Sequence, residues 1–379
     1  MSQHSYSIGM ASAYFALMKG GGEHYTLYLS NALGKMGHEV SIICGKQPLS
    51  EPHPLNENSP INYVSQLFFL RDLGAKKIPY LSGLGSILHN LQYQCFLERH
   101  LDKAHDYDVI HTHDPNSLYM AIQVKQKYGV PVVASFHGPP NQKMIAAVKK
   151  IDAVLPVSDS ICQTFLEHGV NNVYCIPCAV DRAQFKKLKI DDSERPINIF
   201  GHIILFVGRL MPIKNIENLL KAFRIVSASD PSAYLVIVGD GPSKRDLMSL
   251  AGQLDLKEKV LFTGVIPYGD LPSIYNMADV FVLPSLYESF SLVALEAAAC
   301  GVPIVISEEA KAMIQTIGDD ALFPVNPHDP EYISHGILSA LNCGKNSKIV
   351  DLALRRIEKL DWDQNARVVT KIYDSVVNR

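Results

Sequence analysis

The sequence lacks two features that mark large classes of protein: a surplus of positive charge and a long apolar run. Its 379 residues include 35 Lys and Arg against 38 Asp and Glu, a formal net charge of −3. A protein whose main partner is nucleic acid usually shows a basic surplus or a basic stripe, so we expect no nucleic-acid partner. No apolar run approaches the roughly 18 residues that a membrane-spanning helix needs, which leaves only peripheral membrane contact open.

Signs of secretion are also missing. The first thirty residues do not follow the order of charged, apolar and small residues that a signal peptide has. The seven cysteines are odd in number and spread from Cys44 to Cys343, unlike the paired spacing of a disulfide framework. We therefore expect a cytoplasmic protein, with a peripheral position at the inner face of the membrane left open.

The first half of the chain alternates short apolar runs with helical stretches. Residues 20–39 have helical apolar spacing and lie between strand candidates at residues 5–15 and 40–44, which predicts a βαβ unit. This alternation favours a mostly parallel sheet covered on both faces. Residues 52–101 are less regular and are assigned to a helical or loop insertion. Further strand candidates lie at residues 108–114, 130–138, 153–158 and 173–177.

A second series of the same kind follows a charged stretch at residues 180–201, which we interpret as a linker. The length alone favours two to three domains. The predicted fold class is therefore α/β, with two Rossmann-like, doubly wound domains. The strand candidates of the second domain lie at residues 203–210, 233–241, 259–266, 278–285 and 302–307.

Two cations and two carboxylates are placed at strand ends of the second domain. Arg209 and Lys214 follow the first strand and would lie at the carboxyl edge of the sheet, where open α/β folds bind ligands. Arg grips phosphate bidentately and Lys acts as a point charge. A surface pair on a loop is the alternative. The loop at residues 284–291 leads into a helix expected to begin near Phe290, whose free N–H groups would bind an anion.

Glu288 lies in that loop and Glu296 within that helix, eight residues later. At 1.5 Å per residue, Glu296 lies about 7 to 8 Å along the helix from the expected anion site, within reach of the hydroxyls of a ribose. A carboxylate in an apolar helix needs a partner, and we expect that partner to be a ligand. A capping or solvated pair of glutamates is the alternative.

Two Gly-rich turns and one histidine are weaker signals of a binding site. Gly-rich turns at residues 19–24 and 238–244 could approach phosphate, but neither has the full G-x-G-x-x-G spacing with a later acidic residue, which argues against a dinucleotide dehydrogenase. His137 follows a strand end and is expected to point into the site.

Three further motifs favour structural roles. His111, His113 and Asp114 could begin a metal site, yet no further cluster completes it. Cys175 and Cys178 form a C-x-x-C pair without a second pair, which favours a structural role over zinc or redox chemistry. Trp362, the only tryptophan, is expected to anchor a C-terminal helix.

With these motifs the chain resembles the retaining glycosyltransferases of family 4, nearly from end to end. The resemblance implies the GT-B fold, in which two Rossmann-like domains face a cleft. It implies an acceptor-binding domain at residues 1–185, a donor-binding domain at residues 186–360, and a C-terminal helix at residues 361–379 that packs back on the first domain. Stretches that carry it include "GGGEHYTLYLSNALGKMGHEV", "DVIHTHD", "VVASFHG", "ILFVGRLMPIKN", "LVIVGDGP" and "VLPSLYESFSLVALEAAACGVPIV".

The resemblance also implies the role of each site residue. Arg209 and Lys214 would hold the donor diphosphate, Glu296 the ribose and Glu288 the transferred sugar, and His137 would contact the donor sugar near the acceptor. The residues expected to act in catalysis are His137, Glu288, Arg209 and Lys214. The residues expected to bind the donor are Gly21, Gly22, Arg209, Lys214, Gly239, Ile266, Glu288, Ser289, Phe290, Ser291, Leu292 and Glu296.

Two positions depart from the family pattern. Pro177-Cys178-Ala179-Val180-Asp181 stands where the family usually has P-N-G-V-D, which puts the usual turn there in doubt. Ser291 replaces a common glycine after Phe290.

The expected reaction is the transfer of a hexosyl unit, with retention, from a UDP- or GDP-sugar to a glycan, a lipid-linked or a small-molecule acceptor, without a metal or other cofactor. The acceptor would bind the first domain, where Arg71, Lys76 and Lys77 are compatible with a lipid-linked acceptor at a membrane surface. An epimerase-like enzyme or phosphorylase and a non-catalytic sugar-nucleotide-binding protein are the alternatives.

Overall fold

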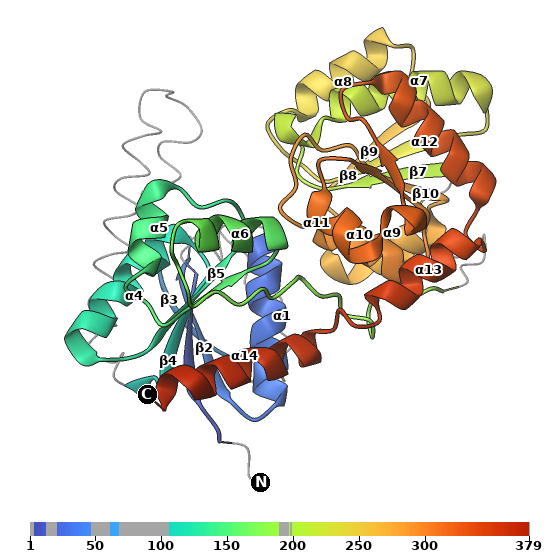
Figure 1. Cartoon of the computed structure of the whole chain (residues 1–379). Helices are drawn as coiled ribbons and strands as arrows, with labels where there is room; N and C mark the ends of the chain where they lie inside the picture. Colours follow the sequence, from blue (N-terminus) through green and yellow to red (C-terminus); the bar gives the residue numbers. More distant parts are fainter. Residues whose placement is uncertain are drawn as a thin grey trace, which may run out of the picture. The chain divides into compact units, whose positions relative to one another are not determined.

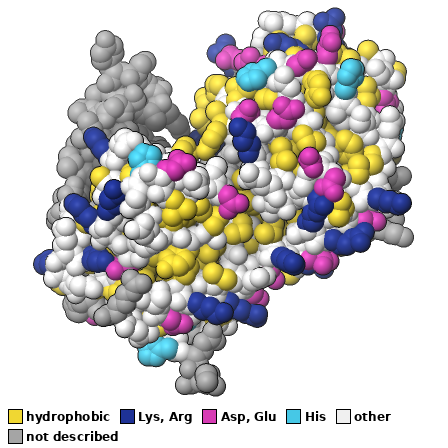
Figure 2. Space-filling view, in the orientation of Figure 1, with side chains coloured by type: hydrophobic (Ala, Val, Ile, Leu, Met, Phe, Trp, Pro, Cys, Tyr) yellow, Lys and Arg dark blue, Asp and Glu magenta, His cyan; other side chains and the backbone are white. Residues whose placement is uncertain are grey.

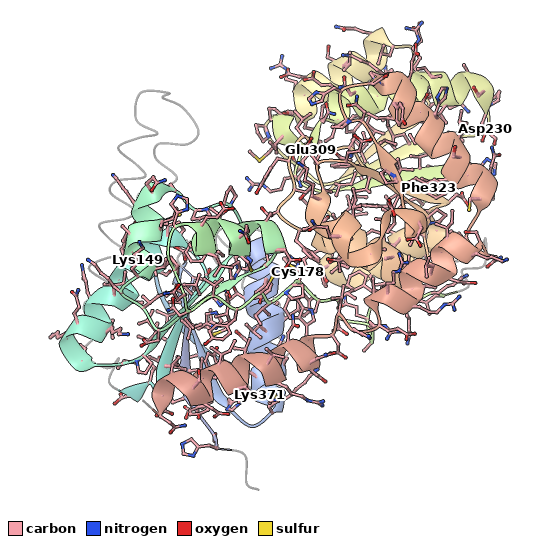
Figure 3. The ribbon with its side chains drawn as sticks, viewed as in Figure 1. Lys149, Cys178, Asp230, Glu309, Phe323 and Lys371 are labelled. Atoms are coloured by element: carbon pink, nitrogen blue, oxygen red, sulfur yellow. The ribbon has the colours of Figure 1, made fainter. Side chains whose placement is uncertain are left out.

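The computed structural model describes residues 4–12, 21–46, 61–67, 106–188, 197 and 199–378. The chain divides into two units, Met1–Pro177 with Trp362–Arg379, and Cys178–Asp361. Cys178, the first residue of the second unit, lies on the extended segment that leads out of the first (Figure 3). Each unit contains a six-stranded parallel sheet (Figure 1).

The sheet of the N-terminal unit has the order β3-β2-β1-β4-β5-β6. Strands β4 and β5 are buried along their whole length, as expected where helices cover both faces. The strands are β1 (Ser7–Ala11), β2 (Glu39–Lys46), β3 (Ile61–Leu67), β4 (Val109–Thr112), β5 (Val132–Phe136) and β6 (Ala153–Pro156). The helices that the structure describes in this unit are α1 (Gly21–Lys35), α4 (Pro115–Tyr128), α5 (Gln142–Val148), α6 (Asp159–Glu167) and α14 (Trp362–Val377).

Two sequence predictions fail in this unit. Residues 61–67, which were assigned to a helical or loop insertion, form the edge strand β3 because their backbone pairs with β2 along its length. The expected strand at residues 173–177 is reduced to a single bridge between Val154 and Val173. The positions of Arg71, Lys76 and Lys77 lie outside the described residues.

The C-terminal helix α14 packs against α1, as predicted. The Trp362 ring meets Tyr25 edge-on with centroids 5.0 Å apart and stacks on Tyr28 at 5.6 Å. Further along the chain, the Asn365 amide donates to the Pro177 carbonyl at 2.7 Å. Trp362 therefore anchors a helix that follows the second unit in sequence but belongs to the first.

The sheet of the C-terminal unit has the order β12-β11-β10-β7-β8-β9. Its strands are β7 (Ile203–Val207), β8 (Tyr234–Val238), β9 (Val260–Gly264), β10 (Val280–Leu283), β11 (Ile304–Ser307) and β12 (Phe323–Val325). Its helices are α7 (Ile216–Ser229), α8 (Lys244–Gln253), α9 (Leu271–Met277), α10 (Leu292–Ala299), α11 (Lys311–Ile317), α12 (Pro330–Cys343) and α13 (Lys348–Ile357), with short 3₁₀ turns η4 (Pro212–Lys214), η5 (Tyr268–Asp270) and η6 (Asp319–Ala321).

Both sheets reverse their direction of winding at one point. The chain runs outward from β1 to β3 and then starts again at β4, and likewise runs from β7 to β9 and starts again at β10. Loops after the two central strands diverge at such a switch point and leave a crevice at the carboxyl ends, where open α/β sheets bind ligands. The topology therefore marks the loops after β7 and β10, and those after β1 and β4.

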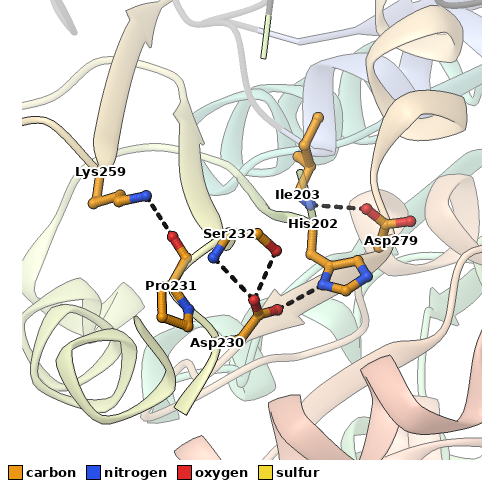
Figure 4. A network of polar contacts seen from close by, with 7 residues as sticks. All are labelled: His202, Ile203, Asp230, Pro231, Ser232, Lys259 and Asp279. Atoms are coloured by element: carbon orange, nitrogen blue, oxygen red, sulfur yellow. Dashed lines mark hydrogen bonds and ion pairs between the residues drawn. The ribbon is translucent and has the colours of Figure 1, made fainter. Parts of the chain in front are cut away.

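The opposite, amino end of the second sheet is closed by a polar network (Figure 4). Asp230 accepts hydrogen bonds from Ser232 and lies 2.6 Å from the ring Nδ1 of His202, and Asp279 accepts from the Ile203 amide at 2.8 Å. These bonds fix the turns that lead into β7, β8 and β10, so we assign this end a structural role.

The charges on the surface and the character of the helices fit the nearly balanced charge and the short apolar runs of the sequence. The face seen in Figure 2 carries Lys and Arg side chains interspersed with Asp and Glu. Within the described residues, none of the helices combines the length and the apolar character that crossing a bilayer requires.

Candidate active site

The loops after β7 and β10 are joined by hydrogen bonds at the switch point. The Leu286 amide donates to the Ile213 carbonyl at 2.9 Å. The buried Asn215 amide group donates to the carbonyls of Pro284 at 3.0 Å and Pro327 at 2.6 Å. Asn215 has φ 56°, a left-handed conformation that asparagine adopts more readily than most residues. Sequence reasoning missed Asn215, which fixes the backbone next to Lys214.

Lys214 and Glu288 meet in this place, although 74 residues separate them in the sequence. Lys214 Nζ forms an ion pair with Glu288 Oε1, which also accepts a hydrogen bond from the buried Ser285 hydroxyl at 2.9 Å. The Lys214 and Glu288 side chains are 22% and 11% exposed, respectively. The structure thus brings together two residues that the sequence placed only at neighbouring strand ends, and the alternative of a solvated glutamate is wrong for Glu288.

Arg209 stands apart from this pair. Its side chain is exposed and forms no hydrogen bond or ion pair within the described part of the chain. Its loop lies against the Gly-rich turn after β8, because the Leu210 amide donates to the Asp240 carbonyl at 3.0 Å. Gly239 in that turn has φ 132°, and a Cβ there would lie 2.0 Å from the Gly208 carbonyl oxygen. Gly239 is therefore required for the close packing of the two loops.

Helix α10 begins at Leu292, two residues later than the sequence predicted. Ser291 is extended and caps the helix, since its hydroxyl accepts from the Ala294 amide at 3.3 Å. An N-cap residue has non-helical backbone angles. The helix therefore cannot extend back through Ser291 to Phe290. Phe290 is buried, and the Ser289 hydroxyl donates to the Tyr287 hydroxyl at 3.3 Å. The first amides of α10 still point away from the helix, as an anion site requires.

Glu296 is buried in the second turn of α10 and is 4% exposed. Tyr268 Oη donates to its Oε1 at 2.9 Å, and Tyr275 Oη donates to its Oε2 at 2.8 Å. Both carboxylate oxygens thus have partners within the protein, which the sequence did not reveal, and the alternative of a solvated side chain is wrong. Burial raises the pKa of Glu296 to about 7, while the two hydrogen bonds act in the opposite direction. Ile266, partly exposed after β9, precedes Tyr268 by two residues.

A second group of predicted residues meets in the N-terminal unit. His137 follows β5, and a Cβ built on Gly22, in the first turn of α1, would lie 3.5 Å from His137 Cδ2. Gly21 is the first residue of that helix. The His137 ring meets Tyr25 at 4.7 Å, and its buried Nε2 has no hydrogen-bond partner in the described residues. The structure thus brings His137 next to Gly22, although Gly21 and Gly22 lie in the first turn of α1 and not in the predicted loop.

Three histidine rings are stacked here. His113 lies parallel to His137 at 5.8 Å and to His111 at 4.5 Å. Burial lowers the pKa of His137 to about 4, and burial together with the nearby His137 lowers that of His111 to about 3. The pKa of His113 is also lowered, first by burial. All three rings are therefore neutral near pH 7.

Two members of the His-x-His-Asp motif make structural contacts, whereas neither ring nitrogen of His113 has a hydrogen-bond partner in the described residues. The ring nitrogens of His111 contact Tyr373 Oη at 2.7 Å and Ser135 Oγ at 2.9 Å, and Asp114 caps α4. In the described part of the chain, no three His, Cys, Asp or Glu side chains are grouped as metal ligands.

The C-x-x-C pair is divided between two environments. Cys175 is exposed and donates to Asp159 Oδ1 at 3.2 Å, whereas Cys178 is buried.

Comparison with known proteins decides the family. The model of "Glycosyltransferase Family 4" matches residues 19–184, and that of "Glycosyl transferases group 1" matches residues 190–356. The chain belongs to glycosyltransferase family 4. This glycosyltransferase is 28% identical to an uncharacterised glycosyltransferase of Methanocaldococcus jannaschii, over 91% of this chain and 92% of the relative. It is also 28% identical to a phosphatidyl-myo-inositol mannosyltransferase of Mycolicibacterium smegmatis, over 97% and 94% of the two chains.

Solved structures share its fold. Sucrose-phosphate synthase of Thermosynechococcus elongatus superposes with a TM-score of 0.82 at 21% identity, over 98% of this chain and 99% of the other. The Anabaena protein HepE, solved with UDP-glucose, gives a TM-score of 0.77 at 18% identity, over 98% and 100% of the two chains. The glycosyltransferase therefore has the GT-B fold, and as a family 4 enzyme it uses a nucleotide-sugar donor.

Proposed function

We propose that this glycosyltransferase moves a hexosyl unit from a UDP- or GDP-sugar, with retention at the anomeric carbon, to a glycan, a lipid-linked or a small-molecule acceptor. The observation that carries the proposal is the Lys214–Glu288 pair at the switch point, next to the amino end of α10. A cation, a carboxylate and free helix amides at one strand edge suit a donor with both a diphosphate and a sugar.

The cationic part of the site stabilises the leaving diphosphate. When the bond between the anomeric carbon and the diphosphate oxygen breaks, negative charge grows on the phosphates. Fixed donors that face this charge lower the barrier. Lys214, held by Glu288 and by the backbone at Asn215, is positioned before the donor arrives. Arg209 is exposed, so its guanidinium is accessible to a phosphate. The amides of residues 290–292 bind the distal phosphate.

The two carboxylates serve the two ends of the donor. Glu288 hydrogen-bonds the hydroxyls of the transferred sugar, and Glu296 those of the ribose. Gly239 brings the loop after β8 close to the phosphates, and Ile266 contacts the base. The acceptor oxygen attacks the anomeric carbon on the face that the diphosphate leaves, and its proton passes to a phosphate oxygen. This front-side attack gives retention without a protein nucleophile.

The N-terminal unit binds the acceptor in this proposal. His137, neutral at pH 7, contacts the donor sugar near the acceptor, and Gly21 and Gly22 approach the diphosphate. Relatives at 26 to 28% identity are named for D-inositol 3-phosphate and phosphatidyl-myo-inositol. Inositol phosphates and phosphatidylinositol are therefore the first acceptors to test. UDP-glucose is the first donor to test, because HepE was solved with it bound.

Replacement of Lys214 tests this proposal. We expect Lys214→Ala to lower turnover of the donor by about two to three orders of magnitude, the effect of removing one fixed donor to a growing negative charge. Arg209→Ala should act in the same direction. Release of the free nucleoside diphosphate, with and without acceptor, is followed by mass spectrometry.

The matched control is Lys221→Ala. Lys221 is an exposed lysine of α7 whose single hydrogen bond within the described residues is to the neighbouring Asn218, at 3.4 Å. Its loss should leave turnover unchanged, and melting curves of all variants check that they fold. Near-wild-type turnover by a folded Lys214→Ala variant would remove the mechanism.

A further inference from the structure

The two oxygens of Glu296 are held by tyrosines in different environments. Tyr275 belongs to α9, is fully buried and donates to Oε2 at 2.8 Å. Tyr268 belongs to the three-residue turn η5, is partly exposed and donates to Oε1 at 2.9 Å. Glu296 itself is only 4% exposed. Each oxygen of this carboxylate thus already has a donor when no nucleotide is bound.

A ribose hydroxyl can reach the carboxylate more easily on the side of Tyr268. Oε2 faces the core, because the buried Tyr275 that donates to it lies beside Phe185 and Phe281. Tyr268 is flanked by the exposed residues Pro267 and Gly269. The ring of Tyr268 touches Phe185 edge-on at 5.2 Å. Oε1 is therefore the oxygen to which a ligand can form a hydrogen bond.

We propose that Tyr268 sets the affinity and the ribose specificity of the donor site. Its hydroxyl occupies Glu296 Oε1 in the free enzyme and gives way to a ribose hydroxyl when a nucleoside diphosphate binds. The inference rests on the proposed function, which places the ribose at Glu296. Because one hydrogen bond replaces another, the ribose gains less than it would from an unoccupied carboxylate, while the buried charge keeps a partner in the empty enzyme.

The test compares ribonucleotides with nucleotides that lack the competing hydroxyls. Tyr268→Phe keeps the ring against Phe185 and removes the hydroxyl. Dissociation constants are measured by titration calorimetry at pH 8 for UDP and 2′,3′-dideoxy-UDP, and in the same way for the GDP and ADP pairs. We expect Tyr268→Phe to bind the ribonucleotide about fivefold more tightly, the value of one net hydrogen bond, and to bind the dideoxynucleotide unchanged.

Tyr275→Phe is the matched control. It also removes one hydroxyl from Glu296, but from the oxygen that the proposal leaves to the protein. No ribose-selective gain is expected in this variant. An equal gain in both variants would show that any loss of a hydrogen bond to Glu296 has the same effect, which would overturn a special role for Tyr268.

The outcomes separate this inference from the proposed function. If wild type prefers the ribonucleotide and Glu296→Gln loses that preference, but Tyr268→Phe shows no ribose-selective gain, then Glu296 binds the ribose and the role of Tyr268 is refuted. If wild type and Tyr268→Phe both bind the ribonucleotide and the dideoxynucleotide equally, or if wild type binds none of them, the placement of the ribose fails and this inference fails with it.

A second measurement avoids the loss of the hydroxyl. With 3-fluorotyrosine placed at position 268 of the full chain, the fluorine resonance should shift on binding of UDP and stay in place on binding of 2′,3′-dideoxy-UDP. Equal shifts with both nucleotides would contradict displacement by the ribose, even if Tyr268→Phe did not fold.

Discussion

Glu296 is a carboxylate that two tyrosines keep inside the core of the C-terminal unit. Burial raises its pKa from the ordinary 4.5 to about 7. Below about pH 4.5 the group is protonated in both the folded and the unfolded chain. Between pH 4.5 and 7 the folded protein keeps a proton that the unfolded chain has released, so stability falls as the pH rises through this range. Above pH 7 the full free-energy cost of burying the charged carboxylate is present.

Glu296→Gln should remove this pH dependence. A shift of this size corresponds to about 3 kcal/mol. We therefore expect the nucleotide-free wild type to lose stability relative to the glutamine variant between pH 5 and pH 8, as measured by chemical denaturation at several pH values. The control is Glu309→Gln, a surface glutamate 3.8 Å from Lys311 (Figure 3). Parallel pH profiles for wild type and Glu296→Gln would refute the buried, proton-binding state.

Single residues also show where sequence reasoning stops. The positions of Lys214 and Glu288 at neighbouring strand ends could be predicted, because parallel strands bring their carboxyl ends to one edge of a sheet. The bonds from Tyr268 and Tyr275 to Glu296 could not, since they join residues 28 and 21 positions apart through the packing of η5, α9 and α10. A helical glutamate in an apolar segment signals that a partner exists, but not which one.

At the scale of elements, the loops after β7 and β8 pack so closely that Gly239 and Gly241 leave no room for a Cβ. Gly239 combines a left-handed φ of 132° with the contact of 2.0 Å that any Cβ would make with the Gly208 carbonyl oxygen. An alanine here would strain the backbone and push away the loop that carries Arg209. The close packing of these loops therefore positions Arg209.

Gly239→Ala should lower both stability and turnover. Left-handed strain alone costs on the order of 1–3 kcal/mol, and the displaced loop should reduce turnover further. Gly252→Ala is the matched control, because Gly252 lies in α8 with nothing within 4 Å of an added Cβ. That change should be neutral or stabilise by up to about 1 kcal/mol. Melting curves and donor turnover are measured for both, and wild-type behaviour of Gly239→Ala would contradict the packing argument.

The elements were predicted most accurately where apolar runs are long and bounded by turns. The alternation of strands and helices around α1 and α7 was confirmed, as was the packing of the C-terminal helix through Trp362. The start of α10 was predicted two residues early, because only the extended backbone of Ser291 shows which serine caps the helix. Residues 61–67 were not recognised as a strand, since their pairing with β2 is a contact between distant segments.

At the scale of the whole molecule, two parallel sheets each present a switch point. The chain belongs to glycosyltransferase family 4, and one family model matches each half of it. In the second unit the switch point carries the Lys214–Glu288 pair. In the first unit His137 follows β5 and lies next to Gly22 in the first turn of α1. The repeated topology thus provides one candidate ligand-binding edge in each unit, and in our proposal the second unit binds the donor and the first the acceptor.

A crystal structure of the full chain with UDP bound tests the central claim most directly, with GDP or ADP in its place if thermal shift shows that one of these binds better. The account predicts the diphosphate within hydrogen-bond distance of Lys214 Nζ, the Arg209 guanidinium and the amides of residues 290–292, with a ribose hydroxyl on Glu296. A nucleotide seated elsewhere, or a Lys214 that still contacts Glu288 alone and no phosphate, would contradict it.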